Sequence, residues 1–119
     1  MYERRAIDEV EPREIDGIEP RLRAIGYELR PKEMRPGVWE YEEGESNNRH
    51  RHEQQEELYV VLSGHFEMEV EEDRLDLETG DVVVVEPDAW RRLTAREESR
   101  ILVIGAPNVK DDGVVEDER

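Results

Sequence analysis

Cysteine is absent from this chain of 119 residues. Its absence excludes disulfide bridges, a thiolate nucleophile and cysteine ligands to zinc. Long apolar runs are missing too. None approaches the roughly 20 residues that a membrane-spanning helix needs, and the N-terminus has no apolar stretch of signal-peptide length. We therefore expect a cytoplasmic protein that makes no contact with a membrane.

Lysine is scarce, since Lys32 and Lys110 are the only two. The 17 lysines and arginines face 33 aspartates and glutamates, which gives a formal net charge of -16. Nucleic-acid binding needs clustered basic residues, which this chain offsets with acid, so we expect no nucleic-acid partner. The acidic residues are scattered along the chain, and an evenly acidic surface favours solubility in concentrated salt. We therefore expect an acidic, halophilic protein; a basic protein partner is the alternative explanation.

The length suits one domain with a dense core between two polar ends. Residues 1–37 carry four of the six prolines and no long periodicity, which is typical of an N-terminal arm. Pro20 and Gly26 are placed to start and end a short N-terminal helical turn. Tyr27–Leu29 and Val38–Tyr41 are predicted to be short strands.

From residue 58 to residue 104 the chain shows short strands at regular spacing. Phe66, Met68 and Val70 alternate with glutamates, which is the pattern of a strand with one buried face. Val82–Val85 is wholly β-branched, and we expect it to be buried on both faces. Several short strands without a strong helix predict an all-β sandwich or barrel.

Two histidines carry the clearest chemical signal. His50 and His52 stand two residues apart, so an extended strand would project both imidazoles to the same face. With a carboxylate on the next segment they make a three-ligand set for a transition metal that leaves coordination positions open. The alternative is a pair of solvated histidines in a polar loop, with Gln54 and Gln55 on the loop surface.

The same stretch resembles the first motif of the cupin superfamily, G-x5-H-x-H-x3–4-E-x6-G. The matching positions are Gly44, His50, His52, Glu57 and Gly64. The resemblance covers about residues 38–105 and agrees with the all-β prediction, which rests on the strand pattern alone.

A small single-domain cupin has an antiparallel jelly-roll β-barrel with a ligand pocket in its mouth. The resemblance implies such a cupin-like barrel over residues 38–107. Small cupins are commonly homodimers, and residues 1–37 are long enough to pack on a partner subunit. Residues 108–119 are expected to form an acidic, solvated C-terminal tail.

The second cupin motif, G-x5-P-x-G-x2-H-x3-N, is degraded in this chain. Only its first glycine is kept, and the departures that follow it are Glu86, Asp88, Arg91 and Ala95. Arg91 replaces the histidine that is the fourth protein ligand in metal-binding cupins. A guanidinium stays protonated and has no lone pair for a metal, so three ligands remain.

Arg91 leaves three arrangements open. It can pair with Glu57 and leave a metal-free pocket, or reach past a metal to hold an anionic substrate group in bidentate fashion. It can also swing out to solvent, where Glu86 or Asp88 would pair with it. His65 follows a turn and is expected to point outward, so it does not replace the missing ligand.

The resemblance implies a divalent transition metal (Fe, Mn, Ni, Cu or Zn) held by His50, His52 and Glu57. A small, anionic ligand would lie in the barrel, contacted by Arg91 and by the aromatic wall of Tyr59. Metal-dependent oxygenase or isomerase chemistry on a small molecule fits such a site. The alternative is a metal-free ligand-binding or sensing module without turnover, because the fold hosts both kinds of protein.

Overall fold

The structure is a computed structural model that describes residues 1–116. Its elements in chain order are η1 (Ile7–Glu9), β1 (Pro12–Ile15), β2 (Ile18–Arg23), α1 (Ile25–Leu29), β3 (Arg35–Tyr41), β4 (His50–His52), β5 (Glu56–Ser63), β6 (His65–Val70), β7 (Asp73–Glu78), β8 (Val82–Val85), β9 (Arg91–Ala95), β10 (Ser99–Ala106) and β11 (Gly113–Val115). No helix in the described part of the chain is long and apolar enough to cross a membrane. The all-β prediction is confirmed.

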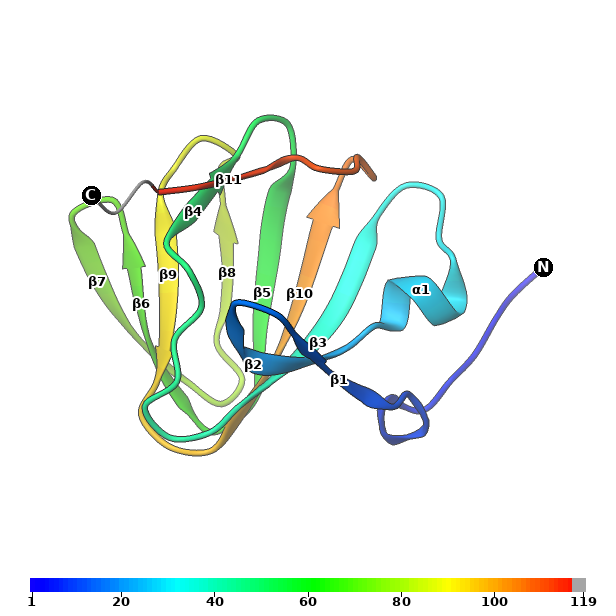
Figure 1. The fold of residues 1–119 in the computed structure, drawn as a ribbon, viewed down its shortest axis with the longest axis horizontal. Helices are drawn as coiled ribbons and strands as arrows, with labels where there is room; N and C mark the ends of the chain where they lie inside the picture. The colour runs from blue at the N-terminus through cyan, green and yellow to red at the C-terminus, as the bar shows by residue number, and fades with distance from the viewer. Residues whose placement is uncertain (117–119) are drawn as a thin grey trace.

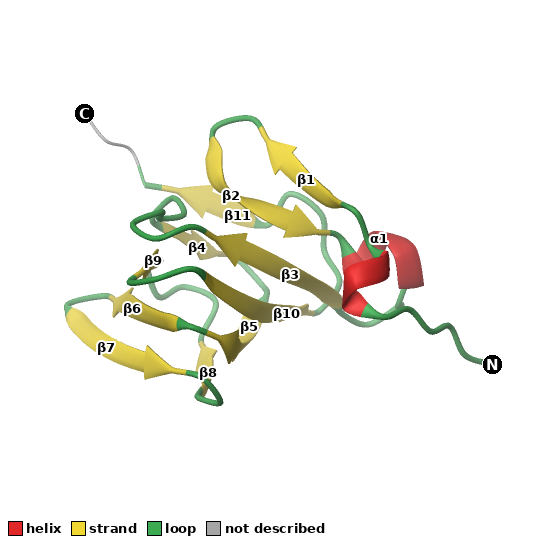
Figure 2. Ribbon diagram, turned by 90° about the horizontal axis from the view of Figure 1, so that it is seen from below, coloured by secondary structure: helices red, strands yellow, loops and turns green. Residues whose placement is uncertain are grey.

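The strands form two antiparallel sheets that pack face to face (Figure 1, Figure 2). One sheet has six strands in the order β1-β2-β3-β10-β5-β8, and the other has five in the order β11-β4-β9-β6-β7. No strand pair in the described residues joins one sheet to the other. The arrangement is therefore a two-sheet jelly roll, and the closed barrel of the prediction is not formed.

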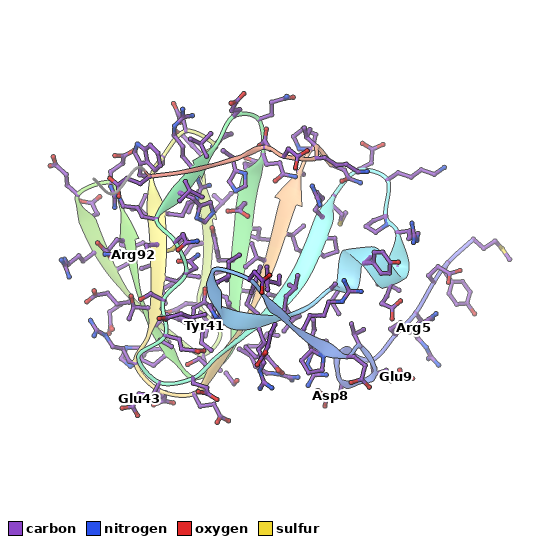
Figure 3. All side chains as sticks on the ribbon, in the orientation of Figure 1. Arg5, Asp8, Glu9, Tyr41, Glu43 and Arg92 are labelled. Atoms are coloured by element: carbon purple, nitrogen blue, oxygen red, sulfur yellow. The ribbon has the colours of Figure 1, made fainter. Side chains whose placement is uncertain are left out.

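The core lies between the sheets because the inner strands alternate. In β10 the residues Ser99, Ile101 and Val103 are buried, while the intervening ones are partly exposed. Phe66 of β6 packs edge-on against Tyr41 of β3, with ring centroids 5.0 Å apart, and so ties one sheet to the other. Figure 3 shows the side chains that fill this space, Tyr41 among them.

Gly64 lets the chain pass from the six-stranded sheet to the five-stranded one. It has a φ of 86°, and a Cβ built there would lie 2.0 Å from Ser99 Oγ. A side chain fits neither the conformation nor the space. Gly64 therefore ends β5, the strand that carries Glu57, and leads the chain into β6.

The N-terminal region departs from the predicted arm. β1 and β2 pair with each other and β2 pairs with β3, so residues 12–23 extend the six-stranded sheet. Arg23 of β2 donates to Glu40 of β3 at 2.8 Å, and Arg100 of β10 reaches the same carboxylate at 2.9 Å. These ion pairs fix the hairpin to the domain.

The predicted helical turn exists, but it is displaced along the chain. Pro20 lies in β2, and the helix α1 runs from Ile25 to Leu29 with Gly26 inside it. The prediction of a strand at Tyr27–Leu29 is therefore wrong. Arg30 ends the helix in a left-handed conformation, with φ 52°, and its N–H donates to the carbonyl of Gly26. A capping geometry within one turn overrides the β-propensity of Tyr27, and leucine itself favours a helix.

Two further expectations fail at sheet edges. Val82–Val85 forms β8, but β8 is an edge strand, and Val82 and Val84 are about 60% exposed, at 59% and 63%. The prediction that this strand is buried on both faces is wrong, because no neighbouring layer covers its outer face. The solvated tail is wrong for residues 113–115, which form β11 and pair with β4; residues 117–119 of that tail lie outside the described residues.

Candidate metal centre

His50 and His52 lie on β4, a short strand held on both sides. His50 is opposite Arg91 of β9 and also opposite Val115 of β11, while His52 is opposite Gly113. This pairing keeps the strand extended, so the two imidazoles project to one face, with ring centroids 5.1 Å apart. The predicted strand geometry for the two histidines is therefore present, and the solvated-loop alternative is wrong for His52, which is 9% exposed.

Glu57 of β5 faces both histidines across the gap between the sheets. Its Oε1 lies 3.3 Å from His52 Nε2 and 3.7 Å from His50 Nε2, and the three ligand atoms all lie within 4.8 Å of one another. Ligands about 2.1 Å from a shared tetrahedral metal would be roughly 3.4 Å apart. The observed spacing therefore fits a three-ligand metal set with small adjustments.

Oxygen atoms near the far nitrogen of each ring fix which nitrogen faces Glu57; the contact is a hydrogen bond for His50 and a longer ion-pair contact for His52. His50 Nδ1 lies 2.9 Å from the carbonyl of Asn48, which can only accept. His52 Nδ1 lies 3.4 Å from a carboxylate oxygen of Asp112. Both Nδ1 atoms are thus placed to carry a proton, which leaves the Nε2 lone pairs free for a metal. His52 Nε2 is buried and makes no hydrogen bond in the described structure.

Asp112 is a functional residue that the sequence analysis missed. It is 6% exposed, and its carboxylate accepts the backbone N–H groups of Gln54 and Gln55 at 3.1 and 2.8 Å. Burial opposes ionisation of Asp112, but these N–H groups and the nearby His52 lower its pKa below the ordinary value. Its position in an apparent tail gave no signal of a role. Gln55, predicted to lie on the surface, is buried at 5% exposure, so that prediction is wrong.

Glu57 is held as a carboxylate. Burial works against the charged form, but His50, His52 and the hydroxyl of Tyr59 outweigh it and hold the pKa of Glu57 well below its ordinary value. The Tyr59 hydroxyl donates to Glu57 Oε1 at 2.6 Å. Burial and the charge of Glu57 raise the pKa of Tyr59, so Tyr59 stays a hydrogen-bond donor. The site thus presents one carboxylate beside two imidazoles.

Arg91 is completely buried, so the predicted arrangement in which it swings out to solvent is wrong. Its Nε lies 3.6 Å from Glu57 Oε1, which is the pairing arrangement. Its terminal nitrogens donate to the carbonyls of Pro87, Ala89 and Glu86 at 3.0, 2.7 and 3.2 Å. The atoms needed for a bidentate grip on a substrate are therefore used inside the protein, and contact between Arg91 and a ligand stays a prediction.

Two cavities meet at the metal centre. The smaller, of about 300 Å³, is lined by both histidines, Glu57, Tyr59 and Trp39. The larger, of about 670 Å³, shares His52, Glu57 and Trp39 with it and extends toward α1 and the 108–113 segment. Tyr59 lies on the cavity wall as predicted. His65 points away, with its Nε2 2.5 Å from Asp76 and its side chain 34% exposed.

Comparison with known proteins gives one family and many similar structures. The Cupin domain profile matches residues 37–105, which is more than half of the chain. The structure of KdgF from Halomonas sp. is 20% identical, with a TM-score of 0.77 over 87% of this chain and 94% of that one. A sugar phosphate isomerase of the cupin superfamily from Silicibacter pomeroyi is 15% identical, with a TM-score of 0.83 over 98% and 83%.

The polyketide cyclase RemF from Streptomyces resistomycificus is 16% identical, with a TM-score of 0.85 over 100% of this chain and 88% of that one. At these identities the likeness is one of fold. No curated protein matches the sequence.

Proposed function

We propose, from the premise that this chain belongs to the cupin family, that it binds a divalent transition metal and a small ligand at the junction of its two cavities. His50 Nε2, His52 Nε2 and a carboxylate oxygen of Glu57 would hold the metal. The observation that carries the proposal is the buried Nε2 of His52, which has no hydrogen-bond partner and faces an ionised carboxylate 3.3 Å away. A buried polar atom without a partner is costly, and a metal would satisfy it.

The donor set suits Fe, Mn, Ni, Cu or Zn, because imidazole and carboxylate together suit the whole group. When bound, the metal would act as a Lewis acid with open positions for a ligand, which fits isomerase or oxygenase chemistry. The similar structures include a sugar phosphate isomerase and a polyketide cyclase, so the fold accommodates more than one reaction.

The protein's own residues prepare the site for that ligand. Asp112 and Asn48 orient the two rings, and Tyr59 holds Glu57 in place. Glu57 and Asp112 bring two negative charges and Arg91 one positive charge, so a divalent metal leaves the centre with a net charge of about +1. A small anionic ligand would neutralise it.

A second function stays open because of Arg91. Its guanidinium at 3.6 Å from Glu57 offsets part of the negative charge that a metal would need. A metal-free ligand-binding or sensing module, in which Arg91 stands where a metal would otherwise balance Glu57, is therefore the alternative.

Elemental analysis separates the two functions. The protein would be purified in high salt without chelator, beside a His50→Ala/His52→Ala variant and a His65→Ala control. We expect close to one metal ion per chain in the parent and in His65→Ala, and none in the double variant. Metal-free protein in every sample, even after incubation with Fe, Mn, Ni and Zn, would refute metal binding and leave the sensing module.

The homodimer is also part of the proposal. β1 forms one edge of the six-stranded sheet, and an edge strand offers unpaired N–H and C=O groups to a second copy. Packing of residues 1–37 on a partner would thus extend the sheet. Light scattering of the parent and of a variant lacking residues 1–16, and with them β1, would test this: a mass of one chain in the parent, or the same dimer mass in both, would refute it.

A further inference from the structure

The larger cavity leads from the metal centre to the surface. At its inner end lie His52 and Glu57, and its outer wall is made by α1, the turn after it and the 108–113 segment. With a volume of about 670 Å³ it is large enough for a small organic molecule. The residues around its outer end indicate which class of molecule it can bind.

Three cations line this outer end: Arg30, Arg35 and Lys110. All three are exposed, and none has a carboxylate oxygen within 4 Å among residues 1–116. Eight other arginines of the same span do form such ion pairs; they are Arg21, Arg23, Arg49, Arg74, Arg91, Arg92, Arg96 and Arg100. Arg4, Arg5, Arg13, Arg51 and Lys32 also lack such a pair within that span, so what distinguishes Arg30, Arg35 and Lys110 is that they gather around one cavity. Asp111 and Asp112 line the same cavity.

The strand register places Arg35 on the same face as Glu57. Arg35 of β3 is opposite Gly105 of β10, and Gly105 is opposite Glu57 of β5. Opposed residues of a sheet project to the same side, and two strand spacings of about 4.8 Å put the backbones of Arg35 and Glu57 roughly 10 Å apart. The residue between them is glycine, and the side-chain amide of Gln55 lies over it, 3.1 Å from where a Cβ would stand.

Arg35 is held in place while most of its donors stay free. One terminal nitrogen donates to the carbonyl of Val109 at 2.8 Å, which fixes the side chain toward the 108–113 segment. The remaining N–H groups have no partner in the described structure. Arg30 lies over the ring of Tyr27, with its guanidinium carbon 4.8 Å from the ring centroid, and so is also partly ordered.

Part of the cavity wall is apolar. Leu22, Trp39 and Val103 line it. The cavity thus offers three zones in sequence: metal ligands, an apolar wall and unpaired cations.

We propose that this cavity binds a small molecule by an oxyanion group, a carboxylate or a phosphate, placed on Arg35 with Arg30 and Lys110 beside it. The carbon body of the molecule lies against Trp39, and its other end faces His52 and Glu57. Binding of the oxyanion to the three cations does not depend on a metal. Coordination of the other end of the molecule rests on the proposed metal function. Within an overall repulsive field, three unpaired cations draw anions to this one opening.

Anion titrations of 15N-labelled, metal-free protein at fixed ionic strength test the cationic end. The probes are inorganic phosphate and succinate, and their relative affinities show which oxyanion is preferred. We expect saturable NMR shifts at Arg35, Gln55 and Lys110. Binding should weaken about fivefold or more in Arg30→Gln/Arg35→Gln, because charge-assisted hydrogen bonds are lost.

The matched control is Arg4→Gln/Arg5→Gln, which removes the same charge from two exposed arginines outside the cavity. It should bind both anions as the parent does. Lys110→Gln is a second test in case the first double variant does not fold, and it should also weaken binding. Absence of saturable shifts in the parent, or equal weakening in both double variants, would overturn the proposal.

The outcome is separable from that of the metal analysis. Anion binding to a protein that takes up no metal supports the cationic cavity and refutes only the metal function. Metal uptake without anion binding refutes the cavity proposal and leaves the metal function standing.

Discussion

Two segments meet at the cluster of His50, His52 and Glu57 and use their polar groups in opposite ways. The first, residues 44–64, turns the Nε2 atoms of His50 and His52 and the carboxylate of Glu57 toward the cavity. The second, residues 80–95, turns the terminal nitrogens of Arg91 away from the cavity and into its own loop. The first segment leaves its imidazole nitrogens and carboxylate oxygens available to a ligand. The second segment uses the N–H groups of its arginine to hold its own backbone.

The difference explains how a site can survive the loss of one ligand. Arg91 satisfies three carbonyls of the loop before β9 and places only its Nε beside Glu57. Arg91 thus clamps its own loop, while His50 Nδ1 is hydrogen-bonded to the Asn48 carbonyl and Glu57 accepts from Tyr59. Ligand geometry and loop architecture are divided between the two segments, and each can be disturbed separately.

The largest effect should come from breaking the clamp. Arg91→Met removes a fully buried guanidinium from three loop carbonyls and from the Glu57 carboxylate, so we expect a loss of about 3 kcal/mol or more in the free energy of unfolding. Arg92→Met is the control on the same strand, because Arg92 is 37% exposed and pairs with Glu69 at the surface. It should cost less than about 1 kcal/mol. Equal losses of unfolding free energy in the two variants, measured by urea denaturation, would show that Arg91 stabilises the protein no more than a surface arginine does.

The next largest effect should come from removing the charge of Asp112, which contacts His52. Asp112→Asn weakens the hold on His52 Nδ1 and on the N–H groups of Gln54 and Gln55, so metal affinity should fall about 10- to 100-fold. Competition with a chelator of known affinity measures it. Asp111→Asn, at an exposed neighbouring position, should leave the affinity unchanged. A parent-like affinity in Asp112→Asn would mean that the ring needs no such support.

The sequence predicts the side-chain arrangement of the first segment better than that of the second. His50, His52 and Glu57 were predictable, because the two-residue period of a strand puts both rings on one face, and the family resemblance added the carboxylate. For Arg91 the sequence left three arrangements open. Only the loop geometry shows that its donors meet three carbonyls, and such contacts depend on how residues 86–89 turn.

The parts that were missed depend on long-range contacts. Asp112 and β11 read as a polar tail because three strand residues carry little periodicity, and their pairing with β4 spans about half of the chain. Val82–Val85 has the composition of a buried strand, yet its position at a sheet edge is set by topology. Local pattern fixes neither the neighbour of a strand nor the layer that covers it.

The pH dependence of the unfolding free energy should distinguish the buried Glu57 from an exposed carboxylate. The pKa of Glu57 lies below its ordinary value of 4.5 in the folded protein, so below that pH the unfolded chain binds a proton that the folded protein does not. The stability that Glu57 contributes is present above pH 4.5 and is lost as the pH falls through the folded pKa. Metal-free Glu57→Gln should therefore lose less stability than the parent between pH 5 and about pH 3.

Glu69→Gln serves as the comparison for the exposed pair. The hydrogen bond from Arg92 lowers the pKa of Glu69 as well, but at the surface. Its effect on the slope of unfolding free energy against pH should be smaller than that of Glu57→Gln. The same slope in both variants would contradict the account of Glu57.

The smallest effect is general and involves neither segment. A net charge of -16 repels itself, and salt screens exposed charges over about 10 Å at 0.1 M. We expect the melting temperature to rise by roughly 5 °C or more between low and multimolar KCl. Salt should screen the buried pair of Arg91 and Glu57 less than it screens the charges on the surface. A flat melting temperature across the KCl series would refute the halophilic prediction.

The most direct test of the metal centre is X-ray absorption of the zinc-loaded protein. The account predicts two imidazole nitrogens and one carboxylate oxygen at about 2.0–2.1 Å from the metal, with the same spectrum in His65→Ala. A first shell of oxygen alone, or with fewer than two imidazoles, would contradict the assignment of His50, His52 and Glu57 as its ligands.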